Sequence, residues 1–181
     1  MFIRGPHPEA IIWRHFRAEG DGFVFAERGA VCEAHILANA DRVVELFLAL
    51  AEHLPPAVQL AVDDVRTGER WHGEALALVE VRDAVARLKG VISFHAGVEL
   101  TVFGPDDQLS ITPNLDIFVF SRTDRWLYLL QGKGLRRVRA LRPRSWRLTR
   151  GEFAPSAEIT AALRATAERL ALSADASLGS P

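Results

Sequence analysis

The sequence predicts an α+β domain, with a mixed, mostly antiparallel sheet packed against three or four helices. Segments in which apolar residues recur every three or four positions alternate with segments in which every second residue is apolar. Most links between the predicted strands are short enough for hairpins, whereas parallel strands need longer crossovers. The length of 181 residues fits one domain, which we place at residues 21–172, after a helical appendage at 1–20 and before a disordered tail at 173–181.

Four segments have helical spacing and are bounded by residues that commonly begin or terminate helices. The second of them places Val43, Phe47 and Leu50 on one stripe and is followed by Pro55, which cannot continue a helix. The last begins after Ser156, whose hydroxyl can accept a hydrogen bond from the first turn. The four predicted helices cover residues 8–18, 39–54, 78–88 and 156–170.

Six segments have the apolar pattern of strands. The first two predict a hairpin, because only Gly29 and Ala30 separate them. The alternation is clearest from Ser93 to Phe103, which predicts a strand with one core face and one wetter face. The runs "LDIFVF" and "RWLYLL" are apolar on both sides, which predicts central strands covered on both faces. The predicted strands are residues 22–28, 31–38, 57–65, 93–103, 115–120 and 125–130, and residues 66–74 are predicted to be a polar loop.

The composition argues against several classes of protein. With 49% hydrophobic and 25% charged residues, the chain is typical of a folded globular domain. No window approaches the roughly 18 consecutive apolar residues of a membrane-spanning helix. Cys32 is the only cysteine, and the first residues lack the uninterrupted apolar stretch of a secretory signal. We therefore expect a cytoplasmic protein with no membrane span.

The charge is unevenly distributed along the chain, although the net charge is −1. Counting Lys and Arg against Asp and Glu gives −8 for residues 1–121, +9 for residues 122–150 and −2 for residues 151–181. A local field of one sign can attract a partner that the net charge would not. The basic stretch therefore raises the hypothesis of a surface that binds an acidic protein or another polyanion.

The candidate binding residues lie in the second half of this basic stretch. Residues 135–141 are compatible with a strand, which disperses the arginines, and with a helix, which gathers them into one ridge. In two simpler interpretations, the arginines form surface ion pairs with the acidic residues of 1–121, or they reflect a general preference for Arg over Lys. The candidates are Lys133, Arg136, Arg137, Arg139, Arg142, Arg144 and Arg147.

Residues with the chemistry for catalysis are few. His95 and Glu99 share the wetter face of a predicted strand, but four residues of strand span about 13 Å, too far for direct proton transfer. Asp116, at the start of another predicted strand, is the group that could join them. Gly97, between the two, predicts a shallow hollow that a ligand could approach.

The sequence predicts no metal site and no cofactor. Cys32 and His35 are three residues apart, a spacing that places them on opposite faces of a strand. A zinc site needs three or four ligands, and the neighbouring sequence supplies no second cysteine or paired histidine.

Three functional hypotheses follow. The first, which we favour, is a non-enzymatic binding or accessory protein that engages an acidic protein partner through its arginine-rich C-terminal surface. The second is a nucleic-acid-binding accessory protein that places the same arginines on phosphates. The third is a small enzyme with a site around His95, Glu99 and Asp116. A homo-oligomer is compatible with all three.

Overall fold

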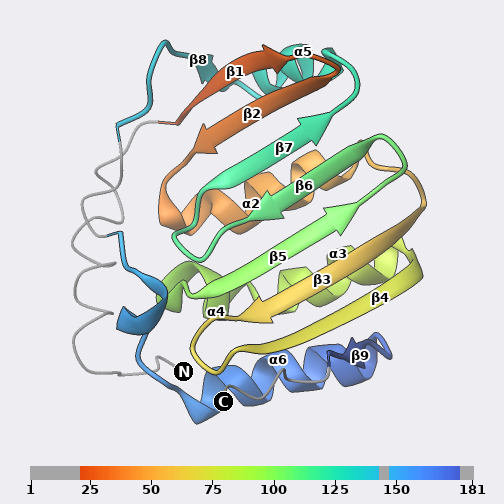
Figure 1. The fold of residues 1–181 in the computed structure, drawn as a ribbon, viewed down its shortest axis with the longest axis vertical. Coiled ribbons are helices and arrows are strands. Elements are labelled where there is room, and N and C mark those ends of the chain that lie inside the picture. The colour runs from red at the N-terminus through yellow and green to blue at the C-terminus, as the bar shows by residue number, and fades with distance from the viewer. Residues whose placement is uncertain (1–20, 143–146, 176–181) are drawn as a thin grey trace.

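The computed structural model describes residues 21–142 and 147–175 of the chain. These residues form one nine-stranded sheet, with the strand order β8-β1-β2-β7-β6-β5-β3-β4-β9, and the helices that pack on it (Figure 1). Every neighbouring pair of strands is antiparallel except β1 and β8. The predicted α+β class with a mixed, mostly antiparallel sheet is therefore confirmed.

The elements follow one another in hairpins and short helical connections. The strands are β1 (Gly22–Arg28), β2 (Val31–Leu37), β3 (Ala57–Asp64), β4 (Glu69–Ala77), β5 (Val98–Phe103), β6 (Asp107–Ile111), β7 (Ile117–Ser121), β8 (Arg136–Arg137) and β9 (Ser173–Ala174). The helices are α2 (Ala40–Ala51), α3 (Leu78–Arg87), α4 (Lys89–His95), α5 (Arg125–Gly132) and α6 (Ala157–Arg169), with a 3₁₀ turn at Arg150–Glu152.

One face of the sheet is covered and the other is open. Helices α2, α3 and α4 lie behind the sheet in Figure 1, and no helix of the described chain crosses the middle of its near face. Val43, Phe47 and Leu50 of α2 are at most 1% exposed, as expected for a helix stripe packed on a sheet. Burial of these side chains against the strands is the main source of stability for this layer.

The open face differs from what the sequence predicts for "LDIFVF". Ile117 and Val119 of β7 are buried, whereas Phe118 and Phe120 are only half-buried on the opposite face. A nearly continuous apolar run indicated a strand covered on both sides, but only one side is covered by helices. The aromatic side chains on the other side are therefore available at the surface.

The segment "RWLYLL" is a helix, so its predicted strand is wrong. Trp126 and Leu130 are both 0% exposed and lie four positions apart on α5, while Tyr128 is 64% exposed. The spacing of the two buried residues has the period of a helix rather than of a strand. The apolar residues between them concealed that period.

The predicted strand 93–103 is a helix end followed by a strand. Ile92, Ser93 and Ala96 are buried at helical spacing, and β5 begins only at Val98. Ala96 and Gly97 have positive φ angles of 51° and 68°, which break the helix and redirect the chain into the strand. His95 is consequently the last residue of α4, and it does not share a strand face with Glu99.

Two strands, β4 and β6, lie where the sequence predicts none. The predicted polar loop at 66–74 is wrong for most of its length, because β4 begins at Glu69, and most residues of this strand are not buried, so they lack the apolar pattern of a strand. The sequence also offers a missed alternation at β6, where buried Leu109 and Ile111 alternate with Gln108 and Ser110. Burial of Ser110 is accompanied by a 3.0 Å hydrogen bond from the hydroxyl of Thr101.

Several predictions concern the ends and the basic stretch. The helix at 8–18 lies outside the described residues. Within the predicted tail, Ser173 and Ala174 pair with Trp71 and His72 of β4 as strand β9. Of residues 135–141, only Arg136 and Arg137 form a strand, so neither a full strand nor a helix is present. No helix in the described ranges is long and apolar enough to cross a membrane.

Candidate partner-binding surface

The basic segment runs along one edge of the sheet and then turns toward the open face. Gly134 has φ = 80°, a conformation that suits glycine at the end of α5, and Leu135 is buried next to it. The short strand β8 then pairs in parallel with Gly22 and Phe23, and the amide of Val138 donates to the carbonyl oxygen of Phe23 over 2.9 Å. These backbone contacts fix the segment, so that the arginine side chains project from a defined edge.

The ion pairs separate the arginines of the chain into two groups. Sixteen arginines lie in the described ranges, and twelve of them have a carboxylate oxygen within 4.0 Å. The remaining four, within these ranges, have no carboxylate partner, and all four are exposed. We call them the four unpaired arginines: Arg136, Arg137, Arg139 and Arg142.

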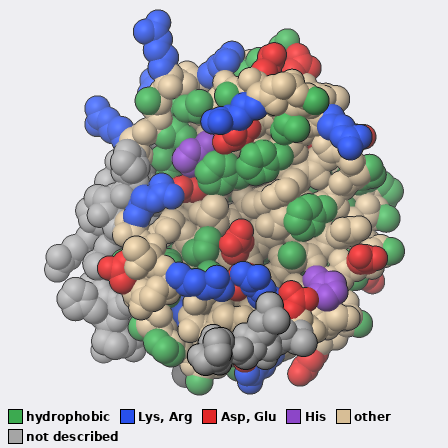
Figure 2. All heavy atoms as spheres, viewed as in Figure 1, with side chains coloured by type: hydrophobic (Ala, Val, Ile, Leu, Met, Phe, Trp, Pro, Cys, Tyr) green, Lys and Arg blue, Asp and Glu red, His purple; other side chains and the backbone are tan. Residues whose placement is uncertain are grey.

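The simpler explanation, that arginines of the basic stretch form ion pairs with acidic residues of 1–121, holds for four of them and not for the four unpaired arginines. Those that pair in this way are Arg122, Arg125, Arg147 and Arg150. Both lysines have carboxylate partners, at Lys89 with Glu45 and at Lys133 with Glu52. Every described side chain of Lys or Arg without a carboxylate partner therefore lies in residues 136–142. Figure 2 shows basic side chains projecting at the upper left, where β8 lies in Figure 1.

Arg137 is anchored to the edge strand by contacts other than an ion pair. Its guanidinium carbon lies 5.8 Å from the ring centroid of Phe25, and Nη2 donates to the carbonyl oxygen of Phe25 over 3.3 Å. A guanidinium held over an aromatic face keeps most of its N–H groups available. Arg137 is therefore partly pre-positioned, while it stays exposed to a partner.

Three of the predicted binding residues differ from this group. Lys133 lies 3.9 Å from Glu52, and Nη2 of Arg147 lies 3.0 Å from Oδ2 of the fully buried Asp116. Arg144 lies outside the described residues. An arginine that compensates a buried carboxylate has a structural role, because removal of its charge would weaken that compensation. The predicted surface is thereby narrowed to the four unpaired arginines.

A hollow of about 330 Å³ lies beside these residues on the open face, above β1 and β2. From β1 and β2 it is lined by the apolar residues Val24, Ala26 and Leu37 and by Arg28, Glu33 and His35, and Arg139 and Arg147 line it from the C-terminal part of the chain. The segment from Arg139 to Leu141 forms the outer wall. We refer to this feature as the β1–β2 hollow. No pattern along the sequence indicates it, because its lining residues are distant in the chain and are brought together by the β1–β8 pairing.

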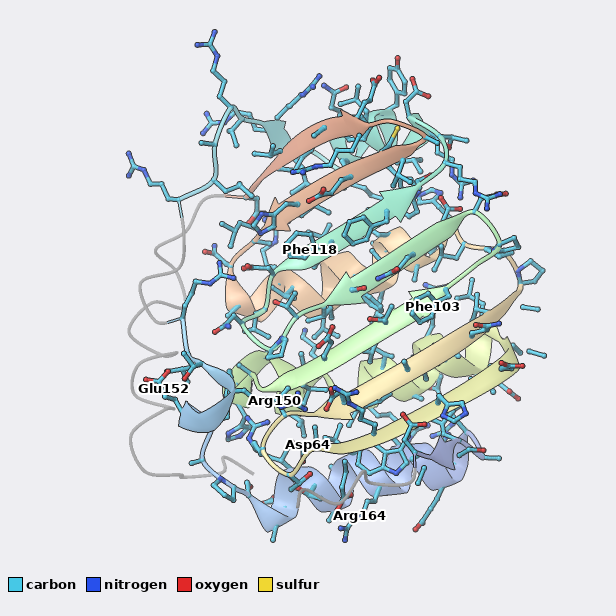
Figure 3. The ribbon with its side chains drawn as sticks, in the orientation of Figure 1. Asp64, Phe103, Phe118, Arg150, Glu152 and Arg164 are labelled. Atoms are coloured by element: carbon cyan, nitrogen blue, oxygen red, sulfur yellow. The ribbon has the colours of Figure 1, made fainter. Side chains whose placement is uncertain are left out.

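A row of aromatic rings continues from the hollow across the open face. The rings of His35 and Phe118 are parallel, with centroids 4.3 Å apart and 12° between their planes, and Phe120 follows 6.2 Å further on. Phe118 is labelled in Figure 3, where its ring lies over the open side of β7. The Nε2 atom of His35 also lies 3.3 Å from Oδ2 of Asp116. The open face thus combines apolar rings with a cationic margin.

The residues predicted for catalysis occupy different environments. His95 ends α4, where its carbonyl oxygen accepts a 2.5 Å hydrogen bond from Arg66, whereas Asp116 contacts His35 and Arg147. The hollow expected at Gly97 is filled, since a Cβ atom placed there would lie 2.4 Å from Nη1 of Arg66. These contacts of His95 and Asp116 therefore involve different partners, and Glu99 lies on strand β5.

The side chain of Arg66 fills the space beside Gly97. That side chain is 3% exposed and lies 3.8 Å from the carboxylate of the fully buried Asp64, which also accepts a 2.8 Å hydrogen bond from the hydroxyl of Thr160. Burial lowers the pKa of the Arg66 guanidinium, and the neighbouring Asp64 opposes that shift. The group joins the end of α4 to α6, which is a structural role.

Cys32 and His35 have environments on opposite sides of β2. Cys32 packs against the core, and burial, followed by the nearby charges of Glu27 and Asp124, raises the pKa of its thiol. His35 lines the hollow on the open face. Among the residues that the structure describes, no three His, Cys, Asp or Glu side chains are grouped as metal ligands would be.

Comparison with protein-family models, with curated proteins and with solved structures gave no match. The fold and the surface define the protein only by class: an α+β protein with an open sheet face, bordered by arginines that have no carboxylate partner in the described chain.

Proposed function

We propose that this chain is a non-enzymatic, cytoplasmic binding protein that engages an acidic protein partner through the four unpaired arginines and the adjoining open face. The observation that carries the proposal is the concentration of all the unpaired basic side chains of the described ranges in one short segment. An unneutralised group of like charges is a cost in self-repulsion, which an oppositely charged partner would remove.

The neighbouring aromatic row favours a protein partner over nucleic acid. Protein interfaces combine an apolar, aromatic centre with a charged margin, as do the rings of the open face and the arginines beside them. Single-stranded nucleic acid instead needs ring faces on which bases can stack. The rings of His35 and Phe118 are stacked on each other at 4.3 Å between centroids, so the faces directed at each other are not available to a base.

Affinity capture tests this proposal. The immobilised protein, and a variant with Arg136→Glu, Arg137→Glu and Arg139→Glu, are exposed to nuclease-treated extract, and the bound proteins are quantified by mass spectrometry. A matched control reverses Arg82, Arg87 and Arg122, which are paired with carboxylates elsewhere and change the net charge equally. We expect an acidic protein to bind the wild type and the control but not the first variant.

Two results would overturn the proposal. One is an identical set of captured proteins for the wild type and the first variant, at unchanged melting temperatures. The other is capture from untreated extract that is absent from nuclease-treated extract, together with an oligonucleotide affinity that falls steeply with salt. The second result would establish the nucleic-acid alternative.

A further inference from the structure

The β1–β2 hollow supplies a more specific feature of the proposed surface than its charge alone. It is the cavity of about 330 Å³ on the open face, and it adjoins the segment that holds the four unpaired arginines. Only Arg139 belongs both to this group and to the wall of the hollow. The hollow is therefore the place where the unneutralised charge and a defined shape coincide.

The basic groups around the hollow are not equivalent. Nε of Arg28 lies 2.9 Å from the carboxylate of Glu33, and Nη2 of Arg147 lies 3.0 Å from that of Asp116. Those two guanidinium groups are held by their ion pairs, yet each has five N–H donors and retains some for a further acceptor. Within the described ranges Arg139 has no carboxylate partner, so the described lining residues and their ion-pair partners together have an excess of one positive charge.

Apolar side chains make up part of the lining of the hollow, and His35 and Glu33 share their face of the sheet. Val24, Ala26 and Leu37 come from neighbouring strands and project on the same side of the sheet, because Val24 pairs with His35 and Ala26 with Glu33 in the β1–β2 register. Apolar lining residues beside a cationic margin match a ligand with a short aliphatic stem and a terminal carboxylate. A glutamate side chain has both parts, while a phosphate group has no stem.

We propose that the β1–β2 hollow receives a glutamate side chain from an extended acidic segment of the partner protein. This inference rests on the proposed function and specifies the chemistry of the partner. The methylene groups would lie over Val24 and Leu37, and the carboxylate would accept hydrogen bonds from Arg139. The flanking residues of the segment would lie near Arg136, Arg137 and Arg142, where further carboxylates are favoured by charge.

A titration followed by ¹⁵N–¹H NMR tests the inference, with a blocked oligoglutamate peptide as the probe. In the wild type, we expect the largest shift changes at the amides around the hollow, and we expect oligoglutamate to bind more tightly than oligoaspartate because its stem is longer. The variant Ala26→Phe fills the hollow and leaves every arginine in place. It should bind oligoglutamate about tenfold more weakly and lose the preference over oligoaspartate.

Control variants separate the hollow from the general charge. Arg139→Gln should weaken binding of oligoglutamate more than Arg142→Gln does, since only Arg139 lines the hollow. Ala140→Phe fills the hollow from an exposed position and serves as the second filling variant if Ala26→Phe lowers the melting temperature. Free glutarate should bind far more weakly than the peptide, because it lacks the flanking carboxylates.

The outcomes distinguish this inference from the proposed function. Equal affinity of the wild type and both filling variants for oligoglutamate, or no binding of oligoglutamate to the wild type, would overturn the inference. Capture of an acidic protein through the arginines would in that case still support the proposed function. Glutarate that binds as tightly as the peptide would identify a small dicarboxylate, rather than a partner protein, as the occupant of the hollow.

Discussion

Arg66 and the four unpaired arginines have opposite environments. Arg66 is 3% exposed, lies beside the buried Asp64 and donates to the carbonyl oxygens of His95 and Ala96 over 2.5 and 2.7 Å. The four unpaired arginines of the β8 segment are exposed and have no carboxylate partner in the described chain. A positive charge at the end of a helix, as at α4, also interacts favourably with the helix dipole.

The comparison shows that an arginine's role follows from its partners and not from the local density of arginine. Arg66 lies in the acidic first part of the sequence, where composition does not single it out. Its contacts with Asp64 and with the end of α4 nevertheless connect β3, α4 and, through Asp64, α6. Residues 133–147 are rich in arginine, but two of the candidate binding residues there, Lys133 and Arg147, have carboxylate partners. The charge map located the region, and the ion pairs selected the residues.

The largest expected effect on stability comes from substitution of the buried Arg66. Arg66→Ala should lower the free energy of unfolding by about 3 kcal/mol, because it leaves the buried Asp64 carboxylate without its nearby cation and removes both hydrogen bonds at the end of α4. Urea denaturation measures the change. Arg136→Ala, on the exposed side, should alter the same quantity by less than about 0.5 kcal/mol. Equal losses for the two variants would contradict the distinction drawn between them.

A second test compares two adjacent acidic residues that differ as the two arginine groups do. Asp107 has a 6% exposed side chain and accepts hydrogen bonds from Trp126 Nε1 over 2.7 Å and from Arg125 Nη2 over 2.5 Å. Asp107→Ala should therefore cost about 2 kcal/mol of stability. Its neighbour Asp106 pairs with Arg122 at the surface, so Asp106→Ala should cost less than about 1 kcal/mol. A larger loss for Asp106 would show that α5 is held in another way.

The smallest expected effect concerns pH. Burial lowers the pKa of His53, and repulsion from Lys133 and Arg125 adds to the shift against an opposing contribution from Glu52. The folded state therefore disfavours the protonated imidazole, so stability is highest above the usual histidine pKa of about 6.5 and falls as the pH drops below it.

This pH effect can be isolated by substitution. The wild type should lose more stability than His53→Gln between about pH 7.5 and about pH 5.5, as measured by the urea midpoint of each protein. Parallel losses in the two proteins would show that the pKa of His53 is the same in the folded and unfolded states.

Much of the fold could be predicted from the sequence, for reasons visible in particular elements. The β1–β2 hairpin and α2 were predictable because two residues separate the strands and because Val43, Phe47 and Leu50 have helical spacing before Pro55. α5 was not, since apolar residues between Trp126 and Leu130 hide the helical period. The end of α4 was missed because Ala96 has a positive φ angle, which the sequence would indicate only at a glycine.

The candidate surface was predictable only in its charge. Which arginines lack partners depends on contacts between distant segments, such as Arg147 with Asp116 and Arg150 with Asp63. The row formed by His35 and the β7 phenylalanines requires the β2–β7 register, in which His35 is opposite Phe118. A pattern along one segment cannot reveal a pairing that forms between two.

The most direct test of the central claim is a calorimetric titration of a blocked oligoglutamate peptide at about 50 mM salt, where surface charge is weakly screened. It compares the wild type, the variant reversed at Arg136, Arg137 and Arg139, and the control reversed at Arg82, Arg87 and Arg122. We predict binding by the wild type and the control, and none by the first variant. Equal binding by the wild type and both variants would contradict the claim that the four unpaired arginines form the recognition surface.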